Sequence, residues 1–100
     1  EVKPYQIHIP DSVLADLRGR LERTRWPGEI PILLDYGSNP GYVKELVDYW
    51  VDGFDWRARE EAINALPHFR ATVQDLDIHF IHHRGSGPNP LPLIITHGWP

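Results

Sequence analysis

The segment "LIITHGWP" (Leu93 to Pro100) decides the fold class of this chain. It begins with a continuous run of apolar or β-branched residues, which is typical of a strand that is covered on both faces in a parallel sheet. It ends with a glycine that allows a sharp change of backbone direction and a proline that restricts the residue before it. We therefore expect a buried strand that leads directly into a tight turn.

The composition places the chain among ordinary soluble globular proteins. It has 100 residues, of which 41% are hydrophobic and 24% charged, and a chain of this length buries only about 60–70% of its unfolded surface. Its formal net charge of −4 argues against nucleic acid as a partner, because phosphate binding needs clustered Lys and Arg. The arginines from Arg18 to Arg25 are interleaved with acidic residues, which predicts a solvated helical face.

Two absences bear on where the protein resides. No apolar run approaches the roughly 18 residues that a membrane-spanning helix needs. The chain contains no cysteine, which suits a reducing compartment, so we expect a cytoplasmic protein. Because the sequence begins at Glu1 without a methionine, an anchor upstream of this residue stays open as an alternative.

The first third of the chain predicts a short extended segment and then a helix. Apolar residues alternate with polar ones from Tyr5 to Ile9, just before Pro10. Asp11 is placed to cap a helix that runs to about Arg25. The apolar positions of this helix fall on one face: Val13, Leu14, Leu17 and Leu21. Residues 28 to 39 mix Pro, Gly and Asn with an apolar patch and predict an irregular loop.

Two more helices are expected before residue 67. Asn39 as the cap and Pro40 in the first turn open one helix, and Gly53 is placed to end it in a left-handed turn. Asp55 caps the next helix, which Pro67 terminates. Three helices joined by proline-rich loops have little core of their own, so we expect them to pack against another part of the protein.

The pattern changes from helical to alternating after Pro67. Residues 69–73 and 78–83 alternate between apolar and polar, and Gln74 to Asp77 make a turn between them, so this region predicts a β-hairpin. A glycine- and proline-rich loop from Arg84 to Pro92 then leads to the apolar strand. Nothing in the chain covers this strand on two sides. We therefore expect an α/β fold whose sheet continues beyond Pro100 and is incomplete in this chain.

Four motifs carry a resemblance to a known family. "HGWP" after an apolar strand resembles the His-Gly-X-Pro motif of epoxide hydrolases with the α/β-hydrolase fold. Three further stretches resemble the N-terminal region of the microsomal-type branch: "LRGRLERTRWP" (Leu17 to Pro27), "YVKELVDYWVDGFDWRAREEAINALPHF" (Tyr42 to Phe69) and "LDIHFIHHR" (Leu76 to Arg84). The resemblance implies an N-terminal helical meander in residues 1–67. It implies the first strands of an α/β-hydrolase core sheet in residues 68–100.

The family's chemistry is what the resemblance implies for the whole enzyme. Members attack an epoxide carbon with an aspartate while two tyrosines of a cap domain polarise the ring oxygen. Water activated by a histidine and an acid then hydrolyses the aspartyl ester, which gives a vicinal diol without any metal or organic cofactor. The second step passes through an oxyanion, and preorganised backbone N–H groups stabilise such a charge.

The matching motif assigns roles to four residues of this chain. The resemblance makes the backbone N–H of Trp99 one donor of the oxyanion hole. Gly98 and Pro100 set the geometry of the turn, and His97 supports it. The nucleophile, the acid, the catalytic histidine and the cap tyrosines lie further downstream in family members and have no counterpart here. We therefore expect this chain to be inactive by itself.

The expected partners follow from the same resemblance. They are a small-molecule epoxide, water, and the remainder of the hydrolase core with its cap domain. An unpaired strand edge at Leu93 to Thr96 further predicts self-association into a homo-oligomer if the chain is made alone.

Other readings stay open at the level of sequence. A haloalkane dehalogenase uses a similar aspartyl-ester route and the same kind of turn, and a non-catalytic docking module would also expose aromatic residues on helices without a core. His79, His82 and His83 suggest a metal, but a strand places His82 on the opposite face and no cysteine or carboxylate cluster completes the ligands. Asp75 and Asp77 are interpreted as turn formers rather than as an acid and base pair.

Overall fold

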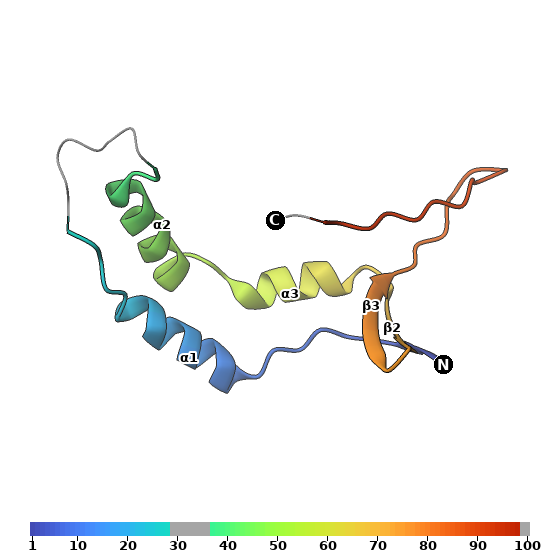
Figure 1. The fold of residues 1–100 in the computed structure, drawn as a ribbon, viewed down its shortest axis with the longest axis horizontal. Helices are drawn as coiled ribbons and strands as arrows, with labels where there is room; N and C mark the ends of the chain where they lie inside the picture. Colours follow the sequence, from blue (N-terminus) through green and yellow to red (C-terminus); the bar gives the residue numbers. More distant parts are fainter. Residues whose placement is uncertain (29–36, 99–100) are drawn as a thin grey trace. The chain divides into compact units, whose positions relative to one another are not determined.

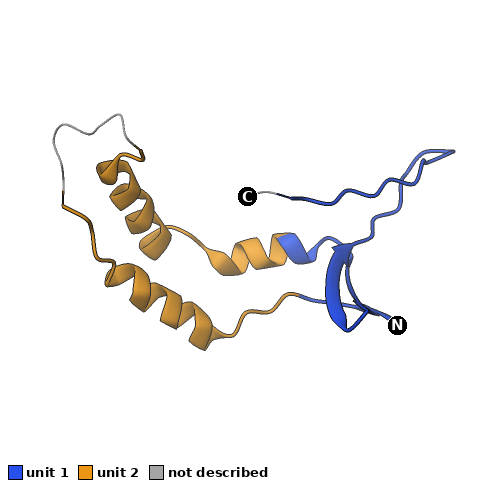
Figure 2. Ribbon diagram, in the orientation of Figure 1, with its two compact units in different colours: residues 1–6, 63–100 blue, residues 7–62 orange. Residues whose placement is uncertain are grey.

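A computed structural model describes residues 1–28 and 37–98 of the chain (Figure 1). The elements are β1 (Val2–Pro4), α1 (Asp11–Glu22), α2 (Pro40–Asp52), α3 (Trp56–Asn64), β2 (His68–Val73) and β3 (Leu76–Ile81). They form two compact units, one of residues Ile7–Ala62 and the other of Glu1–Gln6 with Ile63–Pro100 (Figure 2). Most of the irregular loop expected at residues 28–39 lies outside the described residues.

Helix α1 begins and ends differently from the expectation. Its N-cap is Pro10, and no side chain caps the first turn. Asp11 is the first helical residue, and its carboxylate instead accepts a hydrogen bond from the guanidinium of Arg57 in α3. The helix ends at Glu22 rather than near Arg25, because the Thr24 hydroxyl donates to the Leu21 carbonyl oxygen at 2.7 Å and so satisfies a carbonyl at the helix end.

Helices α2 and α3 begin as expected. The Asn39 side chain accepts a hydrogen bond from the Tyr42 N–H at 3.2 Å, with Pro40 in the first turn, and the Asp55 carboxylate accepts one from the Ala58 N–H at 3.0 Å. The left-handed turn predicted at Gly53 is wrong, since this residue has φ −105° and ψ −19°. A Cβ atom at this position would lie 2.6 Å from the ring of Tyr49, so a larger residue would require this ring to move.

The three strands form one antiparallel sheet in the order β1-β2-β3. The predicted hairpin is confirmed, and the rings of Phe69 and Phe80 stack across it at 5.8 Å between centroids. Its turn is tighter than expected, since only Gln74 and Asp75 connect the strands, with φ of 49° and 65°. Strand β1 pairs with β2 and lies earlier in the chain than the extended segment expected at residues 5–9.

No hydrophobic side chain is buried among the described residues, whose only buried residues are Glu60 and His68. Leu93 to Thr96 do not form the expected strand, because no described residue pairs with them, and Leu93, Ile94 and Ile95 are 79%, 90% and 82% exposed. A buried strand in a complete core sheet therefore stays a prediction. In the part of the chain that the structure describes, no helix is long and apolar enough to cross a membrane.

Candidate functional site

The turn that the sequence singles out is only partly described. His97 and Gly98 are exposed, whereas Trp99 and Pro100 lie outside the described residues. A Cβ atom added at Gly98 would meet nothing within 4 Å, so no described neighbour forces this position to be glycine. The roles predicted for the four residues of the turn, including the oxyanion donor at Trp99, therefore stay predictions.

The helical unit contains a groove whose walls are mostly apolar. It has a volume of about 890 Å³ and is bounded by α1, α2 and the start of α3. Leucines of α1 line one wall and larger side chains of α2 line the other: Leu14, Leu17 and Leu21, and then Leu46, Tyr49 and Trp50. Leu46, Tyr49 and Trp50 are 50%, 54% and 46% exposed. Such a contiguous exposed apolar surface is typical of a site that contacts another protein segment.

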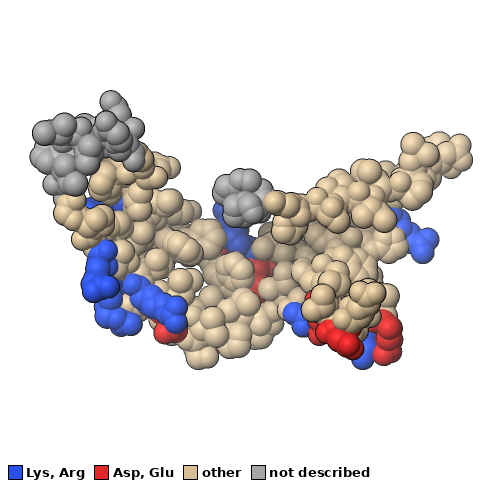
Figure 3. All heavy atoms as spheres, viewed as in Figure 1, with Lys and Arg blue, Asp and Glu red and all other residues tan. Residues whose placement is uncertain are grey.

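The basic residues of α1 lie beside this groove and are largely neutralised. Lys and Arg side chains gather near the end of α1 in the space-filling view (Figure 3). Arg18 pairs with Glu22 at 3.2 Å and with Asp52 of α2 at 2.9 Å, and Arg20 pairs with Asp16 at 2.9 Å. This pattern agrees with the predicted solvated face, and the pair across the two helices joins the walls of the groove.

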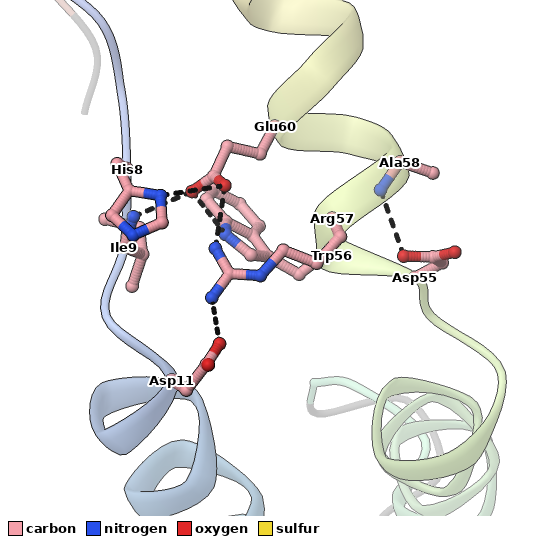
Figure 4. A network of polar contacts seen from close by, with 8 residues as sticks. All are labelled: His8, Ile9, Asp11, Asp55, Trp56, Arg57, Ala58 and Glu60. Carbon is pink, nitrogen blue, oxygen red and sulfur yellow. Dashed lines mark hydrogen bonds and ion pairs between the residues drawn. The ribbon is translucent and has the colours of Figure 1, made fainter.

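A buried carboxylate organises the contact between the start of α1 and α3 (Figure 4). Glu60 of α3 accepts hydrogen bonds from the Ile9 N–H at 2.7 Å, from Trp56 Nε1 at 3.1 Å and from Arg57 Nη1 at 2.7 Å. The Nδ1 atom of the exposed His8 lies 3.9 Å from Glu60 Oε2. Because Arg57 also donates to Asp11, this set of residues, which we call the Glu60 network, ties the start of α1 to α3.

The Glu60 network favours the charged forms of its members. The Ile9 N–H, followed by Arg57 and Trp56, holds the pKa of Glu60 below its ordinary value, although burial opposes this shift. Asp11, and then Glu60, raise the pKa of Arg57. The network contains no nucleophile next to a base, so we interpret it as structural. Sequence reasoning missed it, although Trp56, Arg57 and Glu60 at helical spacing of three and four are a usable signal.

The histidines do not form a metal site in the described part of the chain. No group of three or more His, Cys, Asp or Glu residues there is placed to hold a metal ion. His79 instead contacts His68 of the neighbouring strand, with 3.0 Å between their nearest ring nitrogens. In the hairpin, Asp75 lies in the turn, whereas Asp77 belongs to β3 and accepts a hydrogen bond from the Thr72 hydroxyl at 2.9 Å.

The comparisons with known proteins all indicate the same family. Residues 2–100 match a family model described as "Epoxide hydrolase N terminus". Epoxide hydrolase 1 of Sus scrofa is 38% identical over 107 residues, which cover 99% of this chain and 23% of that protein. The chain thus spans about a quarter of the length of the curated relatives that it matches.

Solved structures give the same result for the fold. The crystal structure of juvenile hormone epoxide hydrolase from the silkworm Bombyx mori superposes with a TM-score of 0.77 and 26% identity, over 88% of this chain and 21% of that one. An epoxide hydrolase from Aspergillus niger gives a TM-score of 0.75 and 26% identity, over 81% of this chain and 22% of that one. These structures have the α/β-hydrolase fold, which confirms the predicted fold class for the N-terminal part.

Proposed function

The chain belongs to the epoxide hydrolase family, in which it matches the N-terminal region, and on this premise we propose that it is the first part of an enzyme that hydrolyses epoxides. The substrates are a small-molecule epoxide and water, and the product is a vicinal diol formed through an aspartyl ester. The match to the family model over residues 2–100 carries this proposal. The names of the relatives favour it over haloalkane dehalogenation and over a purely non-catalytic docking module.

The two parts of the chain have different roles in this proposal. Residues 1–67 form the helical region of the enzyme, and residues 68–100 begin its hydrolase core. The compact units differ from this division at the N-terminus, since β1 pairs with β2. We therefore propose that the first six residues belong with the core although the helices follow them in sequence.

The remainder of the hydrolase is the partner that the groove is proposed to contact. Half-exposed Leu46, Tyr49 and Trp50 supply the apolar surface, and the absence of buried hydrophobic side chains from the described residues means that the helices need packing from elsewhere.

Covalent footprinting of the full-length protein and of this chain alone tests the contact. Tyr49 and Trp50 should be protected in the full-length protein, and protection no greater than that of Tyr42, which is 66% exposed and outside the groove lining, would contradict it.

The turn at the end of the chain is proposed to stabilise the oxyanion of the second step. The Trp99 N–H is the donor, Gly98 and Pro100 set the backbone geometry, and His97 supports the turn. Loss of one such donor typically costs about 2.7–4 kcal/mol of transition-state stabilisation. That loss corresponds to a roughly 100- to 1000-fold slower hydrolysis of the ester.

A Gly98→Val variant of the full-length enzyme tests this role. The aspartyl ester should accumulate and be visible by mass spectrometry of the quenched reaction, while formation of the ester changes much less than its hydrolysis. Gly87→Val is the matched control, because a Cβ atom there also meets nothing within 4 Å and the residue lies in the preceding loop. Normal turnover by the Gly98 variant would refute the assignment.

The cytoplasm is the compartment that we propose for the enzyme. Support comes from the sequence, which contains no cysteine and so suits a reducing environment. Fractionation of the source cells, followed by detection of the full-length protein, tests this proposal. Recovery of the protein with the membranes would contradict it.

A further inference from the structure

The groove between α1 and α2 is built from helical faces on both sides. Leu14, Leu17 and Leu21 line it from α1 at spacings of three and four residues. Leu46 and Trp50 line it from α2 and are one helical turn apart. Side chains at these spacings form the ridges that interdigitate when two helices pack together. The surface of the groove is therefore shaped to receive a further helix.

The backbone of the segment that fills the groove must satisfy its own hydrogen bonds. The two walls are helices, whose N–H and C=O groups are paired within each helix, so neither wall offers a strand edge. A strand or a loop laid against these walls would leave part of its backbone unpaired. Burial of an unpaired peptide group in an apolar groove is costly. A helix avoids this cost because it pairs its backbone groups internally.

The charged side chains among the described residues of the lining are already engaged. Arg18 binds Asp52 at 2.9 Å and so joins α1 to α2. The carboxylate of Asp55 caps α3, and Arg57 belongs to the Glu60 network. A charged side chain that entered the groove would lose water among apolar groups without gaining a free counter-charge from this lining. The inserted face of the helix is therefore uncharged.

We propose that the groove is filled by an amphipathic helix of the same enzyme that follows Pro100 in the sequence. This inference rests on the proposed function, because the remainder of the hydrolase supplies the helix, and the chain covers only 23% of the relative from Sus scrofa. A segment of the same chain is favoured over a second copy, since it is held near the groove at a high effective concentration.

The length of the groove sets the pattern of the helix. Leu14 and Leu21 are seven residues apart, which corresponds to a rise of about 10 Å along α1. The bound helix thus contributes about two turns to the contact. Its apolar residues lie at positions i, i+3 or i+4, and i+7, as in other helices that bind in grooves.

Crosslinking of the full-length enzyme tests this inference. Photo-leucine, an analogue of nearly the same size as leucine that crosslinks under ultraviolet light, is incorporated in place of leucine. Mass spectrometry should find crosslinks from the α1 leucines of the groove and from Leu46 to one stretch of sequence after Pro100. The residues linked in this stretch should be three, four or seven positions apart. Leu17→Ile and Leu46→Ile are the matched controls, because isoleucine is not replaced by the analogue and each variant should lose the crosslinks from its own position.

Three results would overturn the inference. Linked residues two positions apart would indicate a strand, and crosslinks between ¹⁴N- and ¹⁵N-labelled molecules in an equal mixture would indicate a second copy. A groove without crosslinks to any part of the chain after Pro100 would exclude a helix of the same enzyme. Assays of the unmodified enzyme separate this inference from the proposed function. Hydrolysis of epoxides without these crosslinks would refute only the helix in the groove, whereas the crosslinks without hydrolysis of any epoxide would refute only the proposed function.

Discussion

Replacement of Ile94 by alanine tests whether Leu93 to Thr96 form a buried strand of the core or an exposed segment. Ile94 is 90% exposed in the chain described above, and a substitution at such a position normally changes stability by less than about 0.5 kcal/mol. If Leu93 to Thr96 form a strand inside the hydrolase core, almost all of that surface becomes buried. Ile→Ala removes three carbon groups at about 0.8 kcal/mol each, and the cavity left behind brings the expected loss to about 2–4 kcal/mol.

Urea unfolding of the full-length protein, followed by far-ultraviolet circular dichroism, measures this loss. Leu91→Ala is the matched control, because Leu91 is also 90% exposed but lies in the proline-rich loop before the predicted strand. The control should lower the free energy of unfolding by less than about 0.5 kcal/mol. If the Ile94 variant loses no more stability than the Leu91 variant, the reasoning that places a buried strand at Leu93 to Thr96 is refuted.

Three further predictions concern the helical unit. Asn39→Ala should lower the free energy of unfolding by about 1 kcal/mol in urea titrations, because it removes the cap of α2, whereas Ser38→Ala should have little effect. Glu60→Gln should speed amide hydrogen exchange at Ile9, since the neutral amide is a weaker acceptor, and Glu61→Gln is its exposed control. Because the pKa of Glu60 is lowered on folding, its contribution to stability is present in full above the ordinary value of 4.5 and is lost as the pH falls through the lower folded-state value. Acid titrations of the wild-type and Glu60→Gln proteins should therefore converge at low pH, and a constant difference would contradict this linkage.

Features that depend on neighbouring residues were predictable from the sequence. The caps at Asn39 and Asp55 were correct because a cap is made by a side chain and an N–H three residues away. The hairpin was correct because its alternating pattern and its turn lie within one short stretch. The same logic failed at Asp11, whose carboxylate binds Arg57 from a distant helix rather than its own first turn.

Features that depend on distant residues were not predictable. The Glu60 network needs the backbone of Ile9, which no local pattern connects to α3. The contact between His68 and His79 depends on a two-residue turn, and a longer turn would have changed the register of the strands. The role of the turn from His97 to Pro100 was assigned from resemblance alone, and Trp99 and Pro100 lie outside the described residues.

The hydrogen bond between Glu60 and Ile9 closes a loop of the chain, and this loop contains both α1 and α2. The entropic cost of closing such a loop grows only with the logarithm of its length. Extra residues inserted between the two helices should therefore weaken the closure very little. The connection from α1 to α2 is thus a place where evolution can lengthen the protein, or an engineer can graft a peptide tag, without loosening the start of α1 from α3.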